Sequence, residues 1–266
     1  MVLLCPVCGK KLNRIDRACV CEDRHSFDIA RQGYVNLLPV QQKHSLNPGD
    51  TREQVISRRA FLEGGFYAPI VETLVQTARS LDARGPILDA GCGEGYYSSR
   101  LAEALGAELL GLDISKEAVR YAAGKYKNAQ WVCGTAAKLP VASGSIGLLC
   151  SLFAVTIPEE FLRVLRQDGL FFQVLAAQDH LLELKSIIYP ELKLREKDSV
   201  PDLPGFSLVT SVPIRFSFAV EGAQVQNLLS MTPHLYRISK AGADALRATD
   251  SLTDTASCVL NVYRPV

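Results

Sequence analysis

Apolar residues recur with two alternating spacings along most of this chain, one typical of strands and one typical of helices. From residue 86 onward, short apolar runs predict strands at 87–90, 108–113, 130–133, 146–153 and 170–176. Between them, helical spacing predicts helices at 97–105, 116–126 (with Ser115 as its N-cap) and 159–165. Such alternation builds a parallel sheet with helices on both faces. We therefore predict an α/β fold whose ligand lies beyond the carboxyl ends of the strands.

The flanking regions predict elements of other kinds. A helix is expected to start near Thr51 and to close at Gly64-Gly65, and a second helix runs through 70–78. After the alternating region we expect a helix at 180–189, a β-rich run at 206–220, a helix near 223–231 and a last strand at 257–263. The final strands are expected to form an antiparallel edge, with the intervening helices as a cap on the substrate side. Residues 26–38 predict one or two strands that complete an N-terminal module, and residues 41–51 predict a turn or mobile loop.

Composition narrows the class of protein. The 266 residues are 48% hydrophobic and 21% charged, which suits one large domain with an appendage. No apolar run approaches the roughly 18 to 20 residues that span a bilayer, and no export signal is apparent, so we expect a cytoplasmic protein without a membrane partner. Net charge is +1, but residues 1–60 carry ten Lys or Arg and six Asp or Glu. This basic front suits contact with a polyanion, and a plain solvated surface is the alternative.

The N-terminal cysteines have the spacing of a zinc site. Cys5 and Cys8 form C-x2-C, and Cys21 and His25 form C-x3-H twelve residues later. Three thiolates and one imidazole with this spacing suit tetrahedral zinc, which would stabilise a segment too small to bury a core of its own. The alternative is four unrelated buried residues. Cys19 competes as a ligand by position, but we interpret it as a small apolar filler.

A glycine-rich turn follows the first strand of the alternating region. Asp89 precedes Gly91, Gly93 and Gly95, and Asp113 ends the next strand, 24 residues after Asp89. Glycines let the backbone turn tightly against a ligand, and a carboxylate at about this offset holds ribose hydroxyls. The Gly-x-Gly-x-Gly form resembles the first motif of S-adenosylmethionine-dependent methyltransferases. A dinucleotide site and a tight turn without a ligand are the alternatives.

Several short strings together resemble one family over essentially the whole chain. They are the zinc spacing, His25-Ser26-Phe27-Asp28, Gly33-Tyr34-Val35-Asn36-Leu37-Leu38-Pro39, Asn47-Pro48-Gly49-Asp50, Arg59-Ala60-Phe61-Leu62, Gly91-Cys92-Gly93-Glu94-Gly95-Tyr96-Tyr97 and Met231-Thr232-Pro233. This combination resembles the bacterial 23S rRNA (guanine-N1)-methyltransferases of the RlmA (RrmA) family. The resemblance implies a class I S-adenosylmethionine-dependent methyltransferase sheet with a small N-terminal zinc-binding module. It also implies methylation of N1 of a guanine in a hairpin loop of 23S rRNA.

The resemblance assigns roles to individual residues. It implies zinc ligation by Cys5, Cys8, Cys21 and His25, and cofactor contacts by Tyr67, Gly93, Glu94 and His180. From position alone, Tyr67 also suits a buried core tyrosine, and His180 suits a histidine that caps its own helix. The domain division is predicted as 1–38 (zinc-binding RNA-recognition module), 39–66 (linker and basic helix) and 67–266 (methyltransferase domain).

Some features depart from what methyltransferases commonly carry. Gly134-Thr135-Ala136-Ala137 offers no acidic or amide group for adenine, and Ser151-Leu152-Phe153-Ala154-Val155-Thr156 has no Asn-Pro-Pro-Tyr motif and no partnered nucleophilic cysteine. Glu94, Asp179 and His180 are positioned to reach the reaction, but the sequence assigns no catalytic base.

Two other functions and several details stay open. The chain also suits a small-molecule or protein methyltransferase with a structural zinc module, or a non-catalytic zinc-dependent RNA-binding protein. Replacing Arg58 and Arg59 by Ala is expected to weaken RNA binding in the RNA methyltransferase. Neither a homodimer nor the choice of guanine follows from the sequence.

Overall fold

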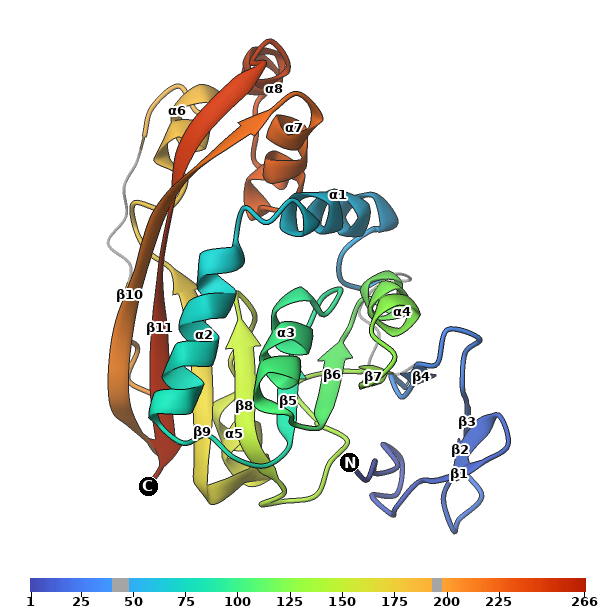
Figure 1. Ribbon diagram of the computed structural model, residues 1–266. Coiled ribbons are helices and arrows are strands. Elements are labelled where there is room, and N and C mark those ends of the chain that lie inside the picture. Colours follow the sequence, from blue (N-terminus) through green and yellow to red (C-terminus); the bar gives the residue numbers. More distant parts are fainter. Residues whose placement is uncertain (40–47, 193–197) are drawn as a thin grey trace.

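The computed structural model describes residues 1–39, 48–192 and 198–266, and a large mixed sheet with its covering helices forms most of it (Figure 1). Its strands are β4 (Val35–Asn36), β5 (Ile87–Ala90), β6 (Leu109–Asp113), β7 (Gln130–Cys133), β8 (Ile146–Leu152), β9 (Leu165–Ala176), β10 (Phe206–Glu221) and β11 (Ser251–Pro265). They lie in the order β10-β11-β9-β8-β5-β6-β7-β4. Neighbours from β9 to β4 are parallel, whereas β11 is antiparallel to β9 and β10. The predicted parallel sheet with an antiparallel edge is confirmed.

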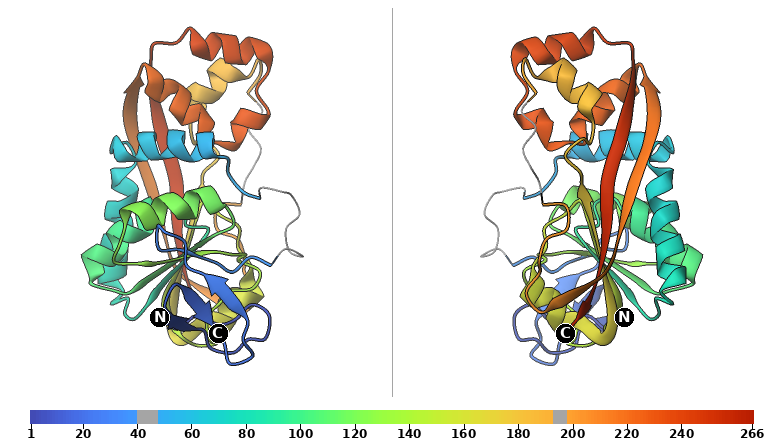
Figure 2. Two further views of the ribbon diagram at one scale, coloured as in Figure 1. Left: turned by 90° about the vertical axis from the view of Figure 1, so that its right-hand side faces the viewer. Right: turned by 90° about the vertical axis from the view of Figure 1, so that its left-hand side faces the viewer.

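Helices cover both faces of this sheet (Figure 2). They are α1 (Arg52–Glu63), α2 (Ala68–Ser80), α3 (Tyr96–Leu105), α4 (Lys116–Lys125), α5 (Pro158–Val164), α6 (Leu182–Ile188), α7 (Ala223–Ser230), the 3-10 helix η2 (Pro233–Tyr236) and α8 (Lys240–Arg247). Apolar side chains of α2, α3 and α4 share one core, in which Leu74, Leu101 and Val119 are fully buried. Phe161 of α5 belongs to the core on the opposite face. None of the helices in the described parts of the chain is long and apolar enough to cross a membrane.

A small N-terminal sheet packs beside the large one. Strands β1 (Asn13–Ile15), β2 (Ala18–Val20) and β3 (Ser26–Asp28) pair antiparallel. Leu3 and Leu12 of this module belong to the same apolar core as Leu139 of the sheet domain. The prediction that strands within residues 26–38 complete this module is confirmed for β3 but wrong for β4, which pairs parallel with β7 and forms an edge of the large sheet. Backbone pairing therefore continues past the module, and the division at residue 38 stays a prediction.

The carboxyl ends of the parallel strands face α1 and a group of C-terminal elements (Figure 1). Strands β10 and β11 pair over their whole length, but β11 contacts β9 only from Cys258 to Tyr263. Their far ends extend beyond the sheet, where α6, α7 and α8 pack together and α7 contacts α1. These elements form a cap over the strand ends, as predicted, and its place on the substrate side stays a prediction.

Most predicted elements agree with the structure to within two residues, and the exceptions lie in the C-terminal third and at β9. Strand β9 begins at Leu165 rather than residue 170, and β11 begins at Ser251 rather than 257. Helix α6 begins at Leu182, so His180 precedes it. Helix α8 and η2 were not predicted, since each is short and α8 has a glycine inside it. Of the loop predicted at 41–51, residues 41–47 lie outside the described residues.

Candidate functional site

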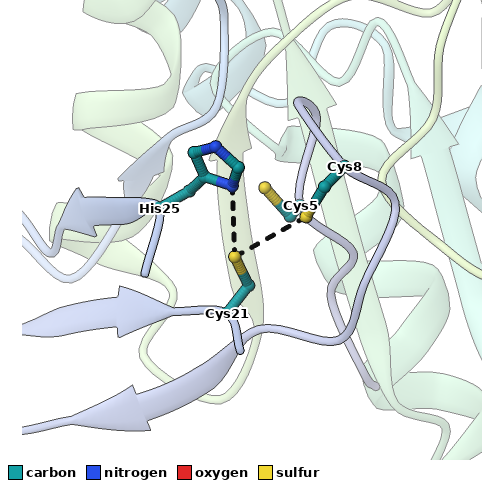
Figure 3. Close-up of side chains that lie close together, drawn as sticks. All are labelled: Cys5, Cys8, Cys21 and His25. Atoms are coloured by element: carbon teal, nitrogen blue, oxygen red, sulfur yellow. Dashed lines mark hydrogen bonds between the residues drawn. The ribbon is translucent and has the colours of Figure 1, made fainter. Parts of the chain in front are cut away.

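The four N-terminal candidates for zinc come together at one point (Figure 3). One ligand atom of each of Cys5, Cys8, Cys21 and His25 lies within 4.8 Å of the others. The Cys8 and Cys21 sulfurs are 3.6 Å apart, and Cys21 Sγ is 3.3 Å from His25 Nδ1. Thiolates bound to tetrahedral zinc at about 2.3 Å lie roughly 3.8 Å apart, so these residues fit the metal in donor type and spacing. Metal binding by these four residues remains a prediction.

Two short turns position these ligands. Gly9 N–H donates to Cys5 O at 2.8 Å, and Gly9 has a φ of +74°, a conformation that suits glycine. In the second turn Arg24 N–H donates to Cys21 O at 2.9 Å. Cys19 is buried in β2 opposite Phe27 and outside the cluster, in agreement with its interpretation as an apolar filler.

The predicted cofactor turn connects β5 to α3, and Asp113 holds it. Gly93 N–H donates to Asp113 Oδ2 at 2.8 Å, and Ser115 N–H donates to Oδ1 at 2.8 Å. Burial raises the pKa of Asp113, while these two bonds and nearby Arg58 offset part of the increase. One carboxylate oxygen of Asp113 thus accepts a hydrogen bond from the turn, and the other accepts one from the start of α4. Its predicted contact with ribose therefore needs the remaining lone pairs.

Packing against neighbouring side chains explains why two of the turn positions are glycine, and the sequence did not reveal this packing. A Cβ on Gly95, whose φ is +79°, would lie 2.3 Å from the Trp131 ring. A Cβ on Gly91, whose φ is +93°, would lie 2.5 Å from Ala154 Cβ. The buried indole of Trp131 thus supports the turn from below. Packing against Trp131 and Ala154 already requires glycine at these two positions. Contact of these glycines with a cofactor therefore stays a prediction.

Asp89 is a buried acid beneath this turn. It is 2% exposed, and its Oδ1 is one of the buried side-chain oxygens without a hydrogen-bond partner among the described residues. Burial, together with the carboxylates of Asp113 and Glu94, raises the pKa of Asp89 to about 7. A cationic group beside Asp89 would stabilise its ionised form. The methionine ammonium of S-adenosylmethionine is such a group, so this acid fits the predicted cofactor.

Glu94 is held by an arginine from α1. Arg58 Nε donates to Glu94 Oε2 at 2.7 Å, and Arg58 also pairs with Asp50, just before α1. Burial alone lowers the pKa of Arg58, but the two carboxylates raise it above its ordinary value. The Arg58 side chain is 20% exposed. Its interpretation as an RNA-binding residue is not supported by this geometry, because the guanidinium faces the turn. A long-range pair of this kind leaves no signal in helical spacing.

Tyr67 and His180 lie together, 113 residues apart in the chain. Tyr67 Oη is 3.4 Å from His180 Nε2, and Ser257 N–H donates to His180 Nδ1 at 3.1 Å. Tyr67 is 2% exposed and packs edge-on against Phe61 and Phe218, so it is a core residue. Burial raises its pKa. His180 does not cap α6, whose N-cap is Leu181 without a side-chain bond. Cofactor contacts by this pair stay a prediction.

This sheet, the glycine turn with its acids and the cysteine–histidine cluster define a class I S-adenosylmethionine-dependent methyltransferase with an N-terminal zinc ribbon. The family described as "RlmA, N-terminal" matches residues 3–46, and the family described as "Methyltransferase domain" matches residues 87–169. A solved structure concerned with conversion of a disulfide bond into a thioacetal group during echinomycin biosynthesis aligns with a TM-score of 0.50. It is 13% identical, covers 73% of this chain and 80% of its own, and so supports the fold alone.

Two relatives have names that specify an activity. A protein of Micromonospora griseorubida, assigned by its name as a 23S rRNA (guanine-N1)-methyltransferase, is 34% identical over 99% of this chain and 97% of its own. The 23S rRNA (guanine(748)-N1)-methyltransferase of Streptomyces fradiae is 41% identical over 68% of this chain and 66% of its own. The chain belongs to the family of 23S rRNA (guanine-N1)-methyltransferases.

Proposed function

We propose that this chain transfers the methyl group of S-adenosylmethionine to N1 of a guanine in a hairpin loop of 23S rRNA. The observation that carries the proposal is the similarity to a relative named for this reaction over 97% of that relative, ribbon and sheet domain included. A small-molecule methyltransferase would need only the sheet domain. The ribbon packs directly against that domain, with Leu4 N–H donating to Pro140 O at 2.8 Å and Lys138 Nζ donating to Pro6 O at 2.8 Å.

The cofactor is proposed to bind across the turn between β5 and α3. Asp89 would face the ammonium group of the cofactor, and Asp113 would face its ribose. Glu94, positioned by Arg58, would lie beside the cofactor in the same turn. When bound, S-adenosylmethionine supplies a methyl carbon already activated by its sulfonium. The protein then has to align guanine N1 with this carbon.

The N1 proton has no assigned acceptor on the chain. Glu94 is paired with Arg58, and Asp179 is paired with Arg215. The Nδ1 of His180 accepts from Ser257. Because each of the three acid–base candidates is engaged, we attribute catalysis mainly to alignment and assign proton release to solvent.

The zinc ribbon is proposed to hold the folded RNA. Its exposed cations suit contact with phosphates, and they include Lys11, Arg14, Arg17, Arg24 and Arg31. A hairpin loop supplies the unstacked base that such an enzyme needs. A cytoplasmic location and a homodimer stay predictions, and light scattering of the purified chain tests the second.

Primer extension on 23S rRNA that lacks the modification tests the proposed function. A methyl group on N1 blocks Watson–Crick pairing, so treatment with the chain and S-adenosylmethionine should stop reverse transcriptase at one guanine. A hairpin with adenosine in place of that guanine should give no stop. No stop and no labelled methyl in any rRNA would refute the proposal. Methyl transfer to small molecules or proteins instead would support the alternative methyltransferase, and lack of cofactor binding would support a non-catalytic RNA-binding protein.

A further inference from the structure

Phe153 has an unusual backbone conformation and an exposed ring. It directly follows β8 with a φ of +56°, a region that bulky residues rarely adopt. It is nevertheless 40% exposed, so core packing does not account for it. Phe153 N–H donates to Val174 O at 2.9 Å, and Ser151 Oγ donates to Val155 O at 3.3 Å. These bonds hold the strand end in place and so maintain the strained conformation. Strain of this kind is concentrated at functional sites.

The position of Phe153 connects it with the cofactor turn. The next residue, Ala154, is the one that a Cβ on Gly91 would overlap. The Phe153 ring centroid lies 6.3 Å from those of Tyr97 and His180. The exposed ring therefore stands beside the turn, at the carboxyl end of a central strand.

The sheet order indicates which part of the reaction this ring serves. Strand β5 lies between β8, which Phe153 follows, and β6, which ends at Asp113. The ring is thus on the side of the turn away from the acid proposed to hold the ribose. An aromatic ring on that side is placed for the acceptor rather than for the nucleoside of the cofactor.

We propose that the Phe153 ring stacks on the target guanine and orients its N1 toward the methyl group. This inference rests on the proposed function. A base taken out of an RNA loop loses its stacking neighbours, and proteins replace them with exposed aromatic or cationic planes. One base–aromatic stack contributes a factor of roughly 10 to 100 in affinity or rate, as its removal by substitution reveals.

Substitutions of Phe153, assayed with the full-length protein on a 23S rRNA hairpin, test the inference. Phe153→Leu keeps an apolar side chain of similar size without a ring face, and kcat/KM for RNA should fall about 10- to 100-fold. Phe153→Trp should stay within about threefold of wild type. Phe153→Gly relieves the positive φ and should be as poor as Phe153→Leu, which separates loss of the ring from backbone strain. Val155→Ala, at an exposed position two residues away, is the matched control and should act as wild type.

Calorimetry of the variants and the activity of the wild-type chain distinguish failure of this inference from failure of the proposed function. Calorimetry should show that every variant binds S-adenosylmethionine within about twofold of wild type. If Phe153→Leu lost cofactor affinity, the ring would belong to the cofactor site and the inference would be overturned. A Phe153→Leu enzyme with wild-type kcat/KM would overturn it as well, while the proposed function would stand. Absence of methyl transfer by the wild-type chain would instead refute the proposed function, and the inference with it.

Discussion

Arg58 Nε lies 2.7 Å from Glu94 Oε2, and this bond joins α1 to the turn that follows β5. Arg58 also pairs with Asp50, and Ser115 Oγ donates to the Asp50 carbonyl at 2.8 Å. The segment before α1 is thereby attached both to the glycine turn and to the start of α4. The geometry of the proposed cofactor site therefore depends on residues that precede the methyltransferase domain in the chain.

Arg58→Ala should weaken the binding of S-adenosylmethionine, because Arg58 holds the turn that is proposed to bind it. The substitution leaves the buried Glu94 carboxylate without its partner, which costs about 3 kcal/mol of folding stability. We expect a lower Tm and a Kd for S-adenosylmethionine raised about tenfold or more. Arg59→Ala on the same helix is the matched control, because Arg59 is exposed and its pair with Glu63 contributes little. Equal cofactor affinity of the two variants in calorimetry would contradict this role of Arg58.

The sequence predicted elements whose signals are local. The capping box of Thr51 with Gln54, the N-cap Ser115 and the short apolar run around Asp89 in β5 made α1, α4 and the sheet predictable. The four proposed zinc ligands could also be grouped from the sequence, since their spacing is a property of two short turns, and the structure brings them together.

The contacts that shape the site were not predictable in the same way. Trp131 fills the space beneath Gly95, and Arg58 reaches Glu94 across 36 residues of chain. Both contacts depend on how distant elements pack, which apolar periodicity does not encode. The short edge strand β4 was assigned to the ribbon for the same reason, because its partner β7 is nearly 100 residues away.

Cys21→Ser should abolish zinc binding, whereas Cys19→Ala should not. Cys21 belongs to the four-residue cluster, while Cys19, two residues earlier, lies outside it. Elemental analysis should find about one zinc per chain in wild type and in Cys19→Ala, and almost none in Cys21→Ser. Loss of the metal should also unfold the ribbon, because so small a segment depends on it for stability. Equal zinc content in both variants would rule out the proposed ligand set.

Asp89 should make the stability of the ligand-free protein depend on pH. Its pKa is raised from 3.8 to about 7, so the folded state favours the protonated acid. The stabilisation is therefore complete below about pH 4 and is lost as pH rises through 7. Asp89→Asn cannot ionise, so its Tm should rise relative to wild type between pH 4 and 8. Thermal melts across this range provide the test, and parallel pH profiles would contradict it.

The cofactor should reverse this trend in the wild-type protein. A cationic ammonium group beside Asp89 favours the carboxylate, so affinity for S-adenosylmethionine should increase between pH 5.5 and 7.5. Asp89→Asn should bind more weakly with little dependence on pH over the same range. Calorimetry at several pH values measures both effects. An equally steep profile in Asp89→Asn would assign the pH dependence to another group.

Arg14 and Arg17 should contribute to RNA binding by neutralising phosphates. Both are exposed on the ribbon hairpin of β1 and β2, and Arg14 is not in an ion pair within the described residues. Replacing both with Ala should weaken binding and reduce the salt slope of log K by about one for each phosphate that is no longer neutralised. Zinc content and cofactor affinity should not change. A salt slope equal to that of wild type would move the RNA-binding surface away from this hairpin.

Gly95→Ala should destabilise the protein more than Gly106→Ala does. Both glycines have positive φ, +79° and +62°, so each substitution carries a backbone cost of about 1 kcal/mol. An added Cβ meets nothing within 4 Å at Gly106, but lies 2.3 Å from the Trp131 ring at Gly95. Overpacking there should add about 1 to 3 kcal/mol. In a Trp131→Leu background this extra cost should largely disappear, so a double-mutant cycle by urea unfolding isolates it. If the two alanine variants were equally stable, the packing of Trp131 against the turn would not be what requires glycine at residue 95.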